Sequence, residues 1–184
     1  MHSYLTPDNI ALLFPDLNSA AQGMTISHFI EVEDGIELVG IDFAGTHTVM
    51  FFFEAYAYVG NDETTIIDMA QSWGGGVLPA RGARIVKFFR LEADRETSFN
   101  PQSWPLPVPG LIWQFMDALE IALREHAVLY ATVPQYFFIP QTAALDRMYN
   151  RLVRRFTDPS RGMTVRVIAQ PENDEGGFYG FERI

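Results

Sequence analysis

The sequence predicts one domain, residues 1–184, of mixed α/β (α+β) class. In it an N-terminal β-meander continues into a mixed, mostly antiparallel sheet flanked by about three to four helices. The length of 184 residues suits one domain, and 48% apolar residues suffice for a core. Apolar side chains recur with a period of two in the first third of the chain, and with a helical period in several later segments.

The first third is expected to form a short helix and then three strands joined by tight turns. The residues Thr6-Pro7-Asp8-Asn9 before Ile10–Phe14 indicate a capped helical turn, which is stopped by Pro15. Alternation begins at Met24 and places His28 among apolar neighbours, as a core histidine. The dipeptides Asp-Gly and Ala-Gly mark the two turns. The three strands are expected at 24–33, 36–43 and 46–59.

Helices alternate with strands in the rest of the chain. A proline-rich loop ending at Gly110 precedes a long apolar helix, and Pro134 interrupts a later strand. Helices are expected at 62–73, 111–126 and 141–156, and strands at 83–91, 128–138, 163–169 and 177–181. Strands and helices in this order predict a mixed sheet with helices packed on it.

Composition excludes several classes of protein. With no cysteine there is no disulfide, thiolate metal site or cysteine nucleophile, and four scattered histidines leave no predicted metal site. The longest apolar runs, such as Val49–Phe53, are far shorter than the ~20 residues of a membrane-spanning helix. The first residues also lack the basic start and following apolar run of a leader. A soluble cytoplasmic protein without membrane contact is expected.

Charge is distributed unevenly along the chain. The first 80 residues hold eleven acidic side chains and no lysine or arginine, so the overall −10 arises there. Such a surface repels phosphate backbones, which argues against nucleic-acid binding, and attracts amines or basic protein surfaces. An acidic surface without a specific partner is the plainer interpretation.

The segment 141–156 is the clearest amphipathic helix. Its arginines include Arg147 and Arg151, on the side opposite the apolar stripe. They are either solvated or paired with acidic residues, or else they hold a phosphate-bearing ligand or an acidic partner.

From about Pro101 onward, the order of proline-rich loop, helix, strand, helix and strand pair resembles the C-terminal half of the GNAT (GCN5-related N-acetyltransferase) fold. The segment Ala144–Leu152 resembles that family's last helix, which has an Ala-rich start and then Leu-Tyr-x-x-Leu. The resemblance implies an acyl-CoA-dependent N-acyltransferase with acetyl-CoA as a possible cofactor. It gives Tyr149 the role of general acid toward the leaving thiolate. The other interpretation of Tyr149 is a core aromatic, because it shares its face with Leu145 and Leu152.

The family binds pyrophosphate with a glycine-rich loop at the start of the helix that here follows Gly110. This chain departs from that pattern, because the stretch from Trp104 to Gly110 has one glycine and three prolines, and prolines lack amide donors. Gly110, Arg147 and Arg151 are the candidate cofactor-binding residues.

Glu54 is the candidate general base, because it interrupts the most apolar strand, and in the resembled fold a glutamate on a central strand often has this role. Alternatively, Glu54 is an ordinary carboxylate among tyrosines or the ion-pair partner of Lys87. Two functions follow: a GNAT-like domain of uncertain or lost acyltransferase activity, or an acidic protein-binding module, such as an immunity, antitoxin-like or phage-encoded inhibitor protein, that covers a basic surface.

Overall fold

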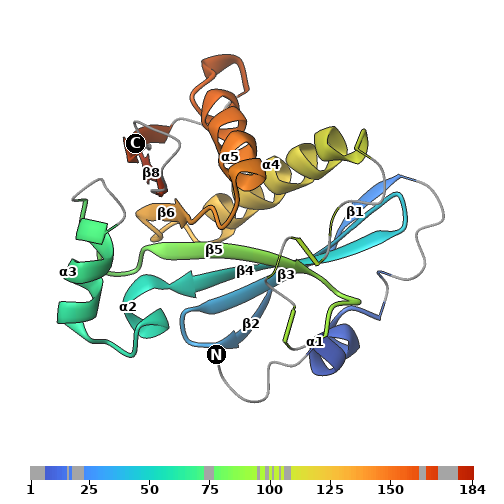
Figure 1. The fold of residues 1–184 in the computed structure, drawn as a ribbon, viewed down its shortest axis with the longest axis horizontal. Helices are drawn as coiled ribbons and strands as arrows, with labels where there is room; N and C mark the ends of the chain where they lie inside the picture. Colours follow the sequence, from blue (N-terminus) through green and yellow to red (C-terminus); the bar gives the residue numbers. More distant parts are fainter. Residues whose placement is uncertain are drawn as a thin grey trace. The chain divides into compact units, whose positions relative to one another are not determined.

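A computed structural model describes residues 7–15, 17, 23–72, 77–94, 96–97, 100, 102–103, 105, 109–161, 165–169 and 178–184 (Figure 1). Eight strands form a mixed, mostly antiparallel sheet in the order β1-β3-β4-β5-β6-β8-β7, with β2 also paired to β3. The chain divides into two compact units, residues 1–51 with 87–123 and residues 52–86 with 124–184. The predicted fold class is confirmed, whereas the single domain stays a prediction.

The first unit contains the meander. After helix α1 (Pro7–Leu13), β1 (Met24–Ile26) and β2 (Ile30–Glu33) both pair antiparallel with β3 (Ile36–Phe43), which is followed by β4 (Thr46–Glu54). The turn between β2 and β3 has Gly35 at φ +77°, and the next has Ala44 and Gly45 at φ 52° and 75°. Both therefore use the left-handed backbone region that tight hairpin turns need.

The single strand predicted over 24–33 is wrong, because a bulge divides it. Ile26 pairs with Ile41, and Ile30 pairs with Leu38. The segment from Ile26 to Ile30 therefore advances four residues while β3 advances three. Ser27 closes the bulge: its N–H donates to the Gly40 carbonyl, and the Gly40 N–H donates to its hydroxyl. The bulge breaks the alternation, so His28 is exposed rather than in the core.

Strand β3 is buried along its whole length because both of its faces are covered. On one face Phe43 packs against Phe115 of helix α4 (Leu111–Leu129). On the other, a side chain at Gly40 would come within 2.5 Å of Leu17, so this glycine lets Leu17 sit directly on the strand.

The second unit begins near the end of β4. The strand predicted over 46–59 is too long, because β4 ends at Glu54 and Ala55–Tyr58 forms the short helix α2. Helix α3 (Glu63–Ser72) follows, beside α2, and then β5 (Arg84–Arg90) (Figure 1). The predicted helix 62–73 and strand 83–91 agree with α3 and β5 apart from their end residues, and Trp73 lies outside the described residues.

Strand β6 (Gln135–Phe138) pairs in parallel with β5 over three residue pairs, Arg84–Val86 with Tyr136–Phe138. The strand predicted over 128–138 is wrong in its first half, because α4 extends to Leu129 and a turn follows. Val128 and Leu129 are exposed there, so their apolar side chains are not packed in the core as the predicted strand would require. The long connection through α4 agrees with the crossover that parallel neighbours require.

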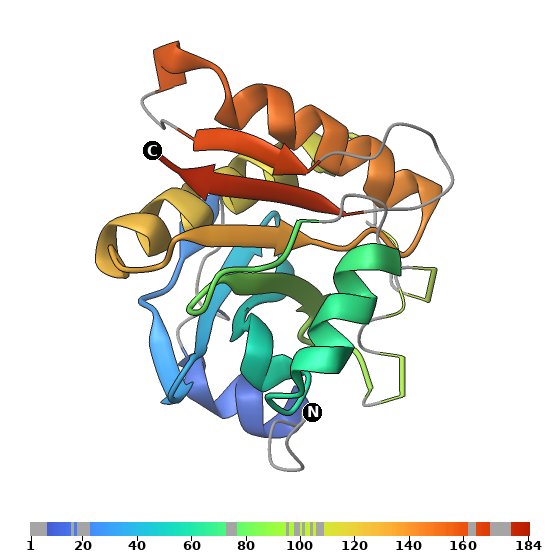
Figure 2. The same cartoon turned by 90° about the vertical axis from the view of Figure 1, so that its left-hand side faces the viewer.

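The C-terminal elements complete the second unit. Helix α5 (Ala143–Phe156) starts at the N-cap Thr142, and a 3₁₀ turn (Pro159–Arg161) follows it. Strands β7 (Val165–Ala169) and β8 (Tyr179–Arg183) form an antiparallel pair, and β8 joins β6 (Figure 2). These elements confirm the helix predicted at 141–156 and the final strand pair, although residues 163–164 and 177 are outside the described part of the chain.

None of the helices in the described segments has the length and apolar content that crossing a bilayer requires.

Candidate functional site

Tyr149 lies inside the core of the second unit, on the buried side of α5. Its ring packs against Phe138 of β6 and Tyr179 of β8, with centroids 5.1 and 5.8 Å away. Only 3% of the residue is exposed. Burial raises the pKa of its hydroxyl well above the ordinary value for tyrosine, which makes it a weaker proton donor. The surroundings favour packing, and the general-acid role stays a prediction.

The orientation of α5 is fixed by a hydrogen bond at its first turn. The Tyr179 hydroxyl donates to the Asp146 carboxylate at 2.7 Å and lies 3.1 Å from the carbonyl of the same residue. Tyr179 is buried and Asp146 is half-buried, and their hydrogen bond joins β8 to α5. Because Tyr149 follows Asp146 by less than one helical turn, the same contact also sets its position.

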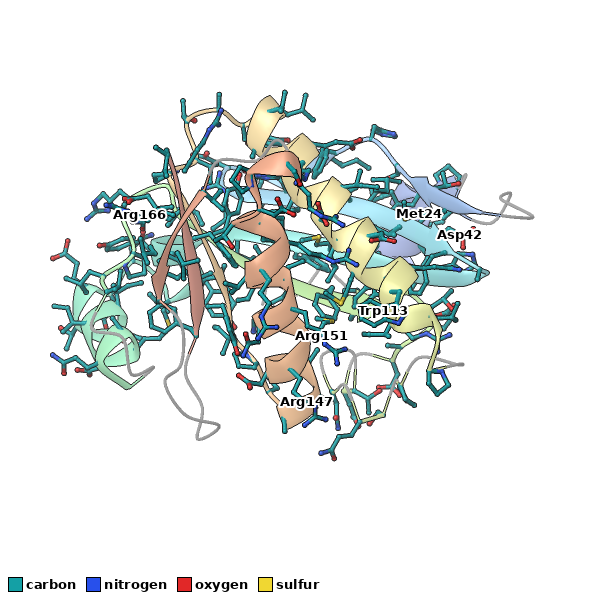
Figure 3. All side chains as sticks on the ribbon, turned by 90° about the horizontal axis from the view of Figure 1, so that it is seen from above. Met24, Asp42, Trp113, Arg147, Arg151 and Arg166 are labelled. Atoms are coloured by element: carbon teal, nitrogen blue, oxygen red, sulfur yellow. The ribbon has the colours of Figure 1, made fainter. Side chains whose placement is uncertain are left out.

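Arg147 and Arg151 lie on the exposed side of α5 (Figure 3). Tyr149, between them in sequence, is buried on the opposite side of the helix. The helix itself therefore separates the two arginines from the tyrosine. A small ligand in contact with the Tyr149 ring would therefore lie on the other side of α5 from these two arginines. The assignment of Arg147 and Arg151 to cofactor binding stays a prediction.

Glu54 stabilises the chain reversal after β4. One carboxylate oxygen accepts the Ala57 N–H at 2.7 Å, which makes Glu54 the N-cap of α2, and the other accepts the Gly82 N–H at 3.0 Å. Both oxygens thus accept backbone N–H groups, one of them in the first turn of α2, which is a structural role. Glu54 remains half-buried, so the sequence-based role as general base stays a prediction.

The candidate cofactor residue Gly110 directly precedes α4 and is exposed, with open space where a side chain would be. It belongs to the first unit, whereas Glu54, Arg147, Tyr149 and Arg151 belong to the second. Most of the proline-rich stretch before it, including Trp104 and residues 106–108, lies outside the described residues.

The sequence analysis missed His126, which is completely buried near the end of α4. Its Nδ1 lies 3.0 Å from the Tyr136 hydroxyl, and its ring stacks on Phe52 and Tyr130 with centroids 3.8 and 4.4 Å away. The signal was present, because His126 follows Leu119 by seven positions and Leu123 by three, on the apolar stripe of the helix. Complete burial among aromatic rings makes it a core residue.

Side chains of the types that ligate metals form no group of three or more suited to an ion in the described segments. A comparison of the chain with protein-family models, curated proteins and solved structures finds no significant match.

Proposed function

We propose that this protein is a GNAT-like N-acyltransferase domain, which takes an acyl group from an acyl-CoA such as acetyl-CoA and passes it to an amine. The observation that carries the proposal is the crossover from β5 through α4 to a parallel β6, followed by α5 and an antiparallel strand pair. This is the element order of the resembled family. The proposal places the protein in the cytoplasm, which fits a sequence without cysteine.

In the proposed reaction the amine nitrogen attacks the thioester carbonyl carbon, the carbon–sulfur bond breaks, and the CoA thiolate leaves. The amine loses one proton and the thiolate gains one. By resemblance these proton transfers fall to Glu54 and Tyr149. The hydrogen bonds that the Glu54 carboxylate accepts from two backbone N–H groups, and the burial of Tyr149, do not support these roles. The proposal therefore depends on the fold, and the two residues are tested separately.

Calorimetric titration with acetyl-CoA and longer acyl-CoAs tests the proposal, with Gly110 as the site of a matched pair of variants. The open space there admits both Gly110→Asp and Gly110→Asn, and both residues are good helix caps. Only the aspartate repels phosphate, so Gly110→Asp should weaken binding by about tenfold or more while Gly110→Asn should not. Absence of heat from the wild-type protein at millimolar ligand would rule the proposal out.

The second candidate is an acidic module that binds a basic protein. The first unit holds twelve acidic and three basic side chains, a net charge of −9, whereas the second holds eleven and ten, a net −1. The exposed acidic residues of the first unit include Glu31, Asp34, Asp94 and Asp117. Pull-down from lysate at low and high salt tests this candidate, and a partner retained equally at both would contradict an electrostatic contact.

A further inference from the structure

One carboxylate oxygen of Asp42 is buried without a partner. Asp42 is the last residue but one of β3, and only 1% of it is exposed. Its Oδ1 accepts the Gly45 N–H at 3.1 Å, whereas its Oδ2 has no hydrogen-bond partner among the described residues. Nearly all buried polar atoms in folded proteins are hydrogen-bonded, so this exception requires a physical explanation.

The β3–β4 hairpin places His47 opposite Asp42. Its turn consists of Ala44 and Gly45, both with positive φ, so the second residue before the turn faces the second residue after it. Two residues that face each other in this way point to the same side of the sheet, with Cβ atoms about 4.5–5.5 Å apart. Asp42 lies at the turn end of β3 (Figure 3). The imidazole of His47 is therefore its ionisable neighbour on β4.

His47 stands between two carboxylates of the first unit. Its Nδ1 is 3.3 Å from Oε1 of Glu92, which follows β5, and β4 lies between β3 and β5 in the sheet. The Leu91 N–H donates to the His47 carbonyl at 2.9 Å, which ties this end of β4 to β5. Glu92 is thus on one side of β4 and Asp42 on the other. A neutral imidazole has one N–H, whereas a charged imidazole has two, so only the charged ring can donate to both carboxylates.

No other described side chain donates to Oδ2 of Asp42. The residue paired with Asp42 on β1 is Thr25, which carries no charge. On the same face of β3, Leu17 packs against Gly40, two residues before Asp42. On β5, the Arg90 side chain donates through Nε to the carboxylate of Glu92 at 3.2 Å.

We propose that His47 is a pH-dependent clamp: when its ring takes up a proton, its two N–H groups donate to Asp42 and to Glu92, on either side of β4. The charged ring supplies the buried carboxylate with the donor and the opposite charge that it lacks. A fold that gains contacts on proton uptake binds the proton more tightly than the unfolded chain does. An imidazole ordinarily changes charge near about pH 6.5, so the stabilisation is present below that pH and is lost as the pH rises above it. The clamp is a property separate from the acyl transfer proposed above.

A double-mutant cycle of D42N and H47Q tests the proposal by urea unfolding of the full chain at about pH 5.5 and about pH 8. D42N keeps an oxygen for the Gly45 N–H and removes the charge. At about pH 5.5 the unfolding constant of the double variant should differ about three- to tenfold from the product of the two single effects. At about pH 8 this coupling should be within about twofold. The matched control cycle is D42N with H28Q, because His28 is exposed and should show no coupling at either pH.

Hydrogen exchange of the Gly45 N–H is a second measurement, which needs no variant of Asp42. Its protection, corrected for the intrinsic effect of pH, should be about three- to tenfold higher at about pH 5.5 than at about pH 8 in the wild-type protein. In H47Q the protection should be the same at both pH values.

Three results would overturn the proposal. Coupling of equal size at both pH values, or no coupling at about pH 5.5, would show that the proton on His47 does not join it to Asp42. A pH-dependent protection that persists in H47Q would assign the effect to another group. Stabilisation of the wild-type protein, but not of D42N, by millimolar Mg²⁺, Ca²⁺ or Zn²⁺ at about pH 8 would assign the unpartnered oxygen to a metal ion. None of these results depends on acyl-CoA binding.

Discussion

Replacing Tyr149 with alanine should destabilise the protein strongly. The side chain is 3% exposed and its ring packs against rings of β6 and β8, so truncation leaves a cavity in the core of the second unit. Removal of a buried aromatic ring costs about 3–5 kcal/mol. For a chain of this length each kcal/mol lowers the melting temperature by about 2–4 °C, so the expected loss is about 6–20 °C.

Urea unfolding and thermal melts followed by circular dichroism measure this effect. Tyr58→Ala is the matched control, because Tyr58 is 40% exposed and its truncation should cost much less. A Tyr149→Ala variant within about 1 kcal/mol of wild type would refute the packing argument.

The variant Tyr149→Phe separates packing from catalysis. It keeps the ring, so stability should stay within about 1–2 kcal/mol of wild type. If acyl transfer is detected, a general acid at this position predicts a loss of about 10²–10⁴-fold in rate, whereas a packing residue predicts little change. The buried environment leads us to expect little change.

Three further predictions concern other described residues. Glu54→Ala should cost about 1 kcal/mol in urea unfolding, because it removes the N-cap of α2, and an unchanged midpoint would contradict that role. Gly180→Ala should cost about 1–3 kcal/mol, because a methyl group there would meet Phe137 at 2.9 Å, whereas Gly110→Ala meets open space and is the control. A hydrogen bond from the Arg166 side chain lowers the pKa of Glu182 in the folded protein. The ionised Glu182 therefore stabilises the fold above its ordinary pKa of 4.5, and this stabilisation is lost as the pH falls through the lower pKa of the folded state. Arg166→Gln should therefore reduce the acid dependence of stability, and an unchanged dependence between about pH 5 and pH 2 would contradict it.

The candidate site was only partly predictable. The amphipathic period of α5 correctly assigned Arg147 and Arg151 to the outer side and Tyr149 to the apolar side. It did not show that β6 and β8 enclose the tyrosine, because such contacts join residues far apart in sequence. Nor did it show that the Gly82 N–H donates a hydrogen bond to the Glu54 carboxylate across the chain reversal.

Local signals in the sequence determined the turns, the helices with strong periods, the charge asymmetry and the α/β class. The turns at Gly35 and Gly45 depend on the backbone freedom of single residues, and α5 depends on its own apolar stripe. Only the tertiary structure decided the bulge at Ser27, the end of β4 at Glu54 and the extension of α4 to Leu129. Each of these depends on which distant backbone group or side chain is available as a partner, and such long-range pairing leaves no periodic trace in a single sequence.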